Sequence, residues 1–196
     1  MKEQEQFSIW IRKIKEGDRT AFRHLYETTV HDVYRTVVFL TTHQQDIEDI
    51  MNEIYIKVWA SIGNYDTDRP FRPWLHGLVI RQVQDWRRKM WRKFRIIEKQ
   101  TRLELTPEGP NTEHAIVFQE TSRELLQAVH SLSYKLRIVI LLRYFHDYSL
   151  NQIAEVLDLP VGTVKSRHHS ALKQLRRHSI WLETESEENV YVRKQS

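Results

Sequence analysis

Residues 148–177 read YSLNQIAEVLDLPVGTVKSRHHSALKQLRR, and the first third of this stretch predicts a short helix. Leu150, Ile153 and Leu157 recur at the spacing of one helical face. Ser149 stands directly before them, where a helix needs a side chain that accepts hydrogen bonds from its unpaired first amides. The pattern therefore gives the first helix both a buried face and a defined beginning.

A tight turn and a second helix are expected next. Asp158 lies where the chain has to turn, and aspartate tolerates the left-handed backbone conformation better than most residues. Pro160 suits the first turn of a helix, where its missing N–H costs nothing. A second apolar face follows, formed by Val164, Ala171, Leu172 and Leu175. The stretch as a whole predicts a helix-turn-helix.

The polar face of the second helix is basic. No acidic residue occurs between Val161 and His178. The basic residues are Lys165, Arg167, Lys173, Arg176 and Arg177. Such a helix suits phosphate contacts and base edges in a major groove. Paired amphipathic helices with solvated basic faces also occur in many all-helical proteins, so the segment alone favours DNA binding without establishing it.

Composition restricts the class of protein. The chain has 196 residues, 40% of them hydrophobic and 29% charged, which is typical of a folded globular protein with one or two domains. The absence of cysteine excludes disulfides, thiolate metal sites and cysteine nucleophiles. No apolar run approaches the length needed to cross a bilayer, and the N-terminus lacks a signal-peptide pattern, so we expect no membrane insertion and a cytoplasmic location. Five glycines and five prolines favour an all-α fold.

Helical spacing recurs along the rest of the chain. We expect helices at about 7–15, 19–41, 46–62, 73–95, 123–130 and 136–145. Asp18 is the expected cap of the second of these, and Asp46 with Asp49 resembles a cap for the third. The expected core of the C-terminal part is Leu125, Leu126, Val129, Leu132, Ile138, Leu141, Leu142 and Tyr144.

Two features of the N-terminal half are candidates for contacts. Asp49, Asn52 and Glu53 stand at i, i+3 and i+4, so they point outward together, either as an ordinary solvated face or as a contact surface. From residue 81 to 99 eight basic residues stand against two acidic ones, a net charge of +6. Trp86, Trp91 and Phe94 interrupt this basic helix and offer π faces for unstacked bases.

A core role is the alternative for two of the aromatic residues. Trp74 and Trp86 both fit the apolar face of the 73–95 helix, and helical spacing alone favours packing as much as stacking. The loop before this helix, residues 63–72, is rich in turn formers.

Periodicity fades after about residue 99, where prolines and a glycine indicate a flexible linker. We therefore expect two small helical domains, at residues 1–98 and 121–182. The linker between them would cover 99–120, and an acidic, frayed tail would cover 183–196.

Taken together, three motifs resemble a compact bacterial sigma factor of the extracytoplasmic-function type. DIEDIMNEIYIKVWASIGNYD looks like that family's polymerase-binding helix, FRPWLHGLVIRQVQDWRRK like its promoter-melting helix, and the helix-turn-helix like its promoter-reading motif. This chain has Met51-Asn52 where an aliphatic-Gln pair is usual, Asp158 where Gly is frequent, and His168 where Leu is frequent.

The resemblance implies partners and site residues. Core RNA polymerase would bind Asp49, Asn52 and Glu53. The minus-10 non-template strand would meet Asn64, Tyr65, Asp66, Arg69, Arg81, Trp86, Arg88, Lys89 and Arg92. The minus-35 duplex would meet Thr163, Lys165, Ser166, Arg167, His169 and Lys173. The resemblance also implies an anti-sigma factor as a partner.

On this interpretation the protein is a transcription initiation factor, with no catalytic residue, metal or cofactor expected. A stand-alone helix-turn-helix regulator is the alternative, but it would not need the acidic face and aromatic-basic helix upstream. A helical enzyme with a histidine metal site is a weaker alternative. Ten histidines are present, but none shows a metal-ligand spacing such as His-Glu-x-x-His.

Overall fold

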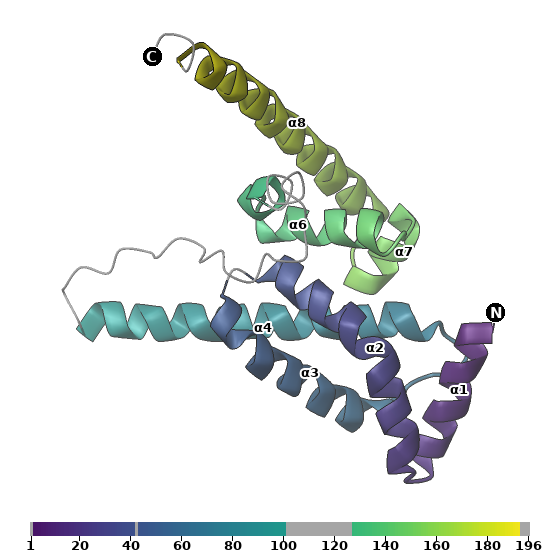
Figure 1. Ribbon diagram of the computed structural model, residues 1–196. Helices are drawn as coiled ribbons and strands as arrows, with labels where there is room; N and C mark the ends of the chain where they lie inside the picture. Colours follow the sequence, from purple (N-terminus) through teal and green to yellow (C-terminus); the bar gives the residue numbers. More distant parts are fainter. Residues whose placement is uncertain (1, 42, 101–126, 193–196) are drawn as a thin grey trace. The chain divides into compact units, whose positions relative to one another are not determined.

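The computed structural model describes residues 2–41, 43–100 and 127–192, and every regular element within those ranges is helical (Figure 1). The chain divides into two units, residues 1–111 and 112–196. The prediction of an all-α protein with two helical domains is confirmed. The expected linker at 99–120 begins inside a helix, and from residue 101 onward it lies outside the described residues. None of the described helices is both long and apolar enough to cross a membrane.

Four helices form the N-terminal unit. They are α1 (Lys2–Lys15), α2 (Arg19–Leu40), α3 (Ile47–Ser61) and α4 (Phe71–Gln100), with short 3-10 turns η1 (Gln44–Asp46) and η2 (Ile62–Asn64) beside α3. Gly17 has a φ of +94°, which a residue with a side chain rarely adopts, and it separates α1 from α2. Asp18 caps α2 as predicted, because its carboxylate accepts hydrogen bonds from the amides of Thr20 and Ala21.

The predicted cap of α3 is wrong. Asp46 occupies the N-cap position, but its side chain makes no capping hydrogen bond. The reason is local: η1 leads directly into α3, so Asp46 has a helical backbone (φ −99°, ψ 0°) rather than the extended one that a capping side chain needs.

The core of the N-terminal unit lies between α4 and the helices α1, α2 and α3, all of which contact it. The deepest side chains from α4 are Phe71, Leu75, Val79 and Val83, and α1 to α3 contribute Phe7, Ile11, Leu25, Val33, Val37, Leu40, Ile50, Ile54 and Val58. The hydroxyls of Thr29 and Tyr55 lie 3.0 Å apart between α2 and α3 and satisfy each other within this apolar setting.

The C-terminal unit contains the helix-turn-helix. After a helical segment at 127–131 come α6 (Tyr134–Ile140), a π-helical turn η3 (Leu141–Phe145), α7 (Leu150–Leu157) and α8 (Val161–Val192). Ser149 and Gln152 form a reciprocal capping box at the start of α7. Asp158 turns the chain with φ 52° and ψ 55°. The helix-turn-helix prediction is therefore confirmed at both its cap and its turn.

Three details differ from expectation in this unit. The expected helix at 136–145 begins at Tyr134 and changes to η3 at Leu141. Tyr144, expected in the core, is 57% exposed, while Leu125 and Leu126 lie outside the described residues. The expected tail is helical as far as the structure describes it, since α8 continues to Val192; this segment is rich in glutamate, which has high helix propensity.

One titratable group makes the stability of the C-terminal unit depend on pH. Burial, with a smaller contribution from the Arg137 cation, lowers the pKa of His130 to about 4 from an ordinary value of 6.5. Between these values the unfolded chain binds a proton that the folded unit does not, so the unfolded state gains stability as the pH falls. We predict that the free energy of unfolding decreases from pH 6.5 to 4, and less so in His130→Gln. Urea titrations of both chains would measure this, and identical pH profiles would contradict it.

Candidate functional site

The acidic face on α3 is divided into two parts. Asp49 and Asn52 are exposed and point away from the unit as predicted. Glu53 is only partly exposed, because its carboxylate accepts a hydrogen bond from Gln82 Nε2 at 3.0 Å and lies 3.8 Å from Lys89 Nζ, both on α4. Glu53 therefore connects the predicted polymerase surface on α3 with the predicted DNA surface on α4.

The loop between η2 and α4 has a defined conformation. The Asp66 carboxylate accepts a hydrogen bond from the Asp68 amide at 3.1 Å and pairs with the Arg69 guanidinium at 3.4 Å. Such a local bond between an aspartate side chain and the backbone two residues on is typical of a turn. Asn64, at the end of η2, is exposed, as are Asp66 and Arg69 in the loop. The loop thus presents an amide, a carboxylate and a guanidinium from a fixed backbone.

Tyr65 differs from its neighbours, because it is only 4% exposed. Its ring contacts those of Phe71 and Trp74, with centroids 5.7 and 4.9 Å away. Its hydroxyl donates a hydrogen bond to the Arg69 carbonyl, and burial raises its pKa. The structure therefore gives Tyr65 a role in holding the loop, and its ring offers no free face to a base.

The polar side of α4 carries the predicted basic residues. Exposed on it are Arg81, Arg88, Lys89 and Arg92. Arg88 pairs with the exposed Asp85 at 2.6 Å, a surface contact of the kind that contributes about 0–1 kcal/mol and leaves the cation available. This side of the helix is therefore an exposed cationic surface.

The two tryptophans of α4 have opposite environments. Trp86 is 7% exposed and packs near His43, with ring centroids 5.9 Å apart, so a core position is correct for it and the expected stacking surface is not there. Trp91 is 66% exposed, and the Arg95 guanidinium lies 5.0 Å from its ring centroid. Five helical residues rotate a side chain by about 140°, so the sequence already contained the signal that these rings face different ways.

In the C-terminal unit, α8 presents its predicted residues at the surface. Exposed are Lys165, Ser166, His169 and Lys173, while Thr163 and Arg167 are partly buried. Val164 and Ala171 are fully buried against the rest of the unit and fix the rotation of α8. The amides of Thr163 and Val164 already donate to the Pro160 carbonyl, which begins the helix at the turn.

Sequence reasoning did not anticipate a contact beside this surface. Tyr144 stacks on His168 with ring centroids 5.8 Å apart, and its hydroxyl lies 3.1 Å from His168 Nε2. Burial, with a smaller effect of the Arg143 cation, lowers the pKa of His168. The contact connects η3 to α8, and His168 faces η3 while His169 is exposed.

Comparison with known proteins gives the family. The description "Sigma-70 region 2" matches residues 25–93, which include α3 and most of α4, and "Sigma-70, region 4" matches residues 122–175, which include the helix-turn-helix. The ECF RNA polymerase sigma factor SigW of Bacillus subtilis is 29% identical over 174 residues, covering 85% of this chain and 93% of SigW.

A second relative and one solved structure are also similar to this chain. The RNA polymerase sigma factor SigV of Bacillus subtilis is 30% identical over 145 residues, covering 74% of this chain and 82% of SigV. The sigma factor RpoE from Bartonella quintana, solved in complex with the anti-sigma factor NepR, has a similar fold, with a TM-score of 0.65 at 18% identity. That similarity covers 80% of this chain and 95% of the solved chain.

This chain belongs to the sigma-70 family, among its extracytoplasmic-function RNA polymerase sigma factors. It is thus a factor that binds core RNA polymerase and directs initiation at promoters. The presence of both regions in one chain favours this function over the stand-alone regulator. The roles of individual residues remain predictions.

The opposite environments of the two tryptophans predict different mutational costs. Trp86→Ala should lower the free energy of unfolding by about 3–5 kcal/mol, because it leaves a cavity in the core. Trp91→Ala should change it by less than about 0.5 kcal/mol, because its ring is at the surface. Urea denaturation of the two variants would measure this, and equal costs would contradict the assigned environments.

Proposed function

We propose that the two units divide promoter recognition between them. The domain predicted at residues 1–98, within the N-terminal unit, would bind core polymerase and the minus-10 element. The domain predicted at residues 121–182 would place the polymerase by reading the minus-35 element. The observation that supports this most is the position of the exposed basic surfaces, since one lies on α4 within the region 2 match and the other on α8 within the region 4 match.

Asp49, Asn52 and Glu53 would form the docking surface for core polymerase. Asp49 and Asn52 are free to meet a partner because both are exposed. Glu53 would contribute from the edge of the surface, where Gln82 and Lys89 hold its carboxylate. A carboxylate surface of this kind suits a partner with complementary positive charge.

The loop and the polar side of α4 would hold the separated minus-10 non-template strand. Asn64, Asp66 and Arg69 provide the hydrogen-bonding groups that an unstacked base requires. The exposed cations would attract the phosphate backbone, namely Arg81, Arg88, Lys89 and Arg92. Tyr65 and Trp86 would support this surface from within the core.

Trp91 would take the stacking role first expected of Trp86. Its ring is exposed, and Arg95 already lies over it with a guanidinium that can neutralise a nearby phosphate. Stacking of a base on such a ring contributes about 1–3 kcal/mol in proteins that bind single strands.

The minus-35 duplex would meet α8. Lys165, Ser166, His169 and Lys173 are exposed along one stretch of the helix, and Thr163 and Arg167 lie at its border. A helix of this kind in a helix-turn-helix enters the major groove with its N-terminal residues on base edges. Lys165 is therefore the first candidate for base contact.

Regulation and location follow from the same function. The solved relative from Bartonella quintana is in complex with an anti-sigma factor, and a protein of this class is the proposed inhibitor of this chain. The factor would act in the cytoplasm, where polymerase and promoter DNA meet. Its contribution would be binding and strand separation, with no covalent chemistry of its own.

Reversal of charge at Asp49 tests the docking surface. Asp49→Arg should abolish co-purification with core polymerase, because it replaces an attractive charge with a repulsive one at an exposed position. Glu48→Arg makes the same charge change on an exposed neighbouring side of α3 and should retain binding. Thermal unfolding of both variants checks the fold. Normal co-purification of the Asp49 variant would contradict the proposed surface.

Removal of the Lys165 ammonium tests the minus-35 surface. Lys165→Ala should weaken binding to a minus-35 duplex by about 1–3 kcal/mol, because a base contact is lost. Lys135→Ala removes an exposed lysine from α6 rather than from the reading helix, and controls for general loss of charge. Footprinting at fixed salt would measure both. If Lys165→Ala bound the duplex with the affinity of the parent, Lys165 would not belong to the proposed minus-35 surface.

A further inference from the structure

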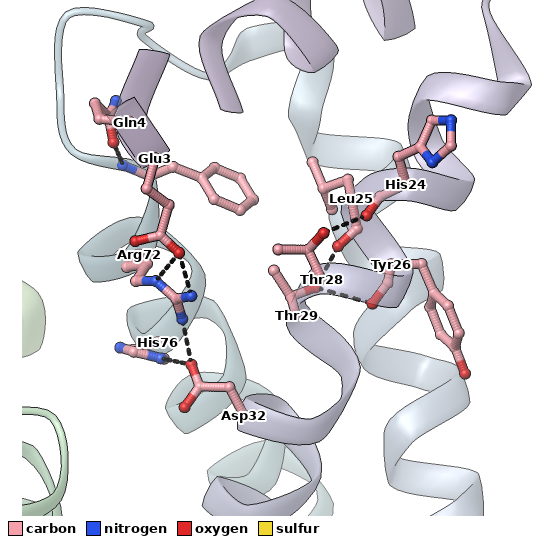
Figure 2. Close-up of polar contacts among 11 residues, drawn as sticks. Glu3, Gln4, His24, Leu25, Tyr26, Thr28, Thr29, Asp32, Arg72 and His76 are labelled. Atoms are coloured by element: carbon pink, nitrogen blue, oxygen red, sulfur yellow. Dashed lines mark hydrogen bonds and ion pairs between the residues drawn. The ribbon is translucent and has the colours of Figure 1, made fainter. Parts of the chain in front are cut away.

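Helix α1 contacts both ends of the loop that precedes α4. At one end, Lys15 Nζ donates a hydrogen bond to the Tyr65 carbonyl at 3.0 Å. At the other end, the Gln4 side chain makes two bonds: its Nε2 donates to the Arg69 carbonyl at 3.1 Å, and its Oε1 accepts from the Phe71 amide at 2.9 Å. Figure 2 shows Gln4 reaching the start of α4. The loop is thus held from outside as well as by its own turn.

The spacing of these two residues on α1 explains how one helix can do this. Gln4 and Lys15 are eleven residues apart, which is close to three full turns, so their side chains lie on the same side of α1. Eleven residues also separate them by about 16 Å along the helix axis. One rigid face of α1 therefore extends along the loop from its first residue to its last.

α1 is itself fixed in place. Phe7 and Ile11 are buried in the core, and the rings of Phe7 and Phe71 lie 4.7 Å apart. The Glu3 carboxylate pairs with Arg72 Nη2 at 2.5 Å, and Arg72 Nη1 pairs with Asp32 of α2 at 2.9 Å (Figure 2). Because α1 is anchored to both α2 and α4, its bonds to the loop hold the loop in place relative to the core.

The bonds from α1 act on the loop backbone and do not cover the side chains that would meet a base. The Arg69 carbonyl accepts from both Gln4 and Tyr65, so its peptide is fixed from two directions. The side chains of Asn64, Asp66 and Arg69 remain exposed. The region 2 match begins at residue 25, so α1 lies outside the part of the chain that the family description covers.

We propose that α1 is a positioning element for minus-10 recognition, in which Gln4 and Lys15 hold the two ends of the loop so that its side chains meet an unstacked base in one geometry. The proposal rests on the proposed role of the loop in binding the minus-10 strand. Gln4 and Lys15 are positioning residues, because they act through the loop backbone and do not touch DNA themselves.

Base discrimination by the polymerase holoenzyme tests this. The DNA is a fork-junction promoter whose minus-10 non-template strand is single-stranded and carries each of the four bases in turn. The readout is the affinity ratio between the best and worst base. Gln4→Ala and Lys15→Met should each lower this ratio by about 2–10-fold, the usual effect of one or two lost hydrogen bonds. Lys15→Arg, which keeps a donor, should restore much of it.

Matched variants on α1 separate positioning from a general defect. Gln6→Ala and Lys13→Met remove the same side-chain types from exposed positions that make no hydrogen bond to the described loop, and should leave the ratio unchanged. All variants should keep parental affinity for a minus-35 duplex and for core polymerase. A parental ratio in Gln4→Ala and Lys15→Met would overturn the proposal, as would an equal loss in the control variants.

Hydrogen exchange in the free full-length chain gives a second, DNA-independent test. In Gln4→Ala the Phe71 amide loses its acceptor, so it and the loop amides should exchange faster than in the parent. Parental exchange rates would overturn the positioning role. A parent chain that shows no base preference would instead contradict the proposed role of the loop in DNA binding, and the exchange rates would still decide whether α1 holds it.

Discussion

The N-terminal unit depends on the burial of one face of α4. Leu75, Val79 and Val83 are fully buried, and removal of each such side chain from water contributes about 1.5–3 kcal/mol. Rotation of α4 about its axis would expose them, so the core fixes which residues face solvent. Arg88 and Arg92 point outward for this reason rather than through any attraction of their own. The same rotation directs Trp86 inward and Trp91 outward.

In the C-terminal unit, buried residues and a turn together fix the orientation of the reading helix. Its apolar contacts fix α8 through Val164 and Ala171, while the angle between α7 and α8 is set by the left-handed backbone of Asp158. The cap at Ser149 begins α7 and the turn residue Asp158 ends it, so these two positions define the bounds of the first helix of the motif. In both units, therefore, a buried stripe determines where the polar side of a helix can make contacts.

Local signals made much of this structure predictable, and long-range contacts did not. The helical period located α4 and α8 and the side of each that carries cations, and the cap at Ser149 and the turn at Asp158 follow from residue type. The bonds from Gln4 and Lys15 to the loop join residues 50 to 67 positions apart, so no local pattern could predict them. The burial of Trp86 was one of two alternatives, since an aromatic residue on a basic helix is compatible with packing or with stacking, and the burial of Tyr65 was not predicted.

Transcription in vitro measures the central claim most directly. Purified core polymerase would be supplied with this chain and a library of promoters in which two six-base segments and the distance between them are randomised. The account predicts that initiation requires the chain and selects two separate sequence elements at a fixed spacing, one for each unit. Absence of chain-dependent initiation, or selection of a single element, would contradict it.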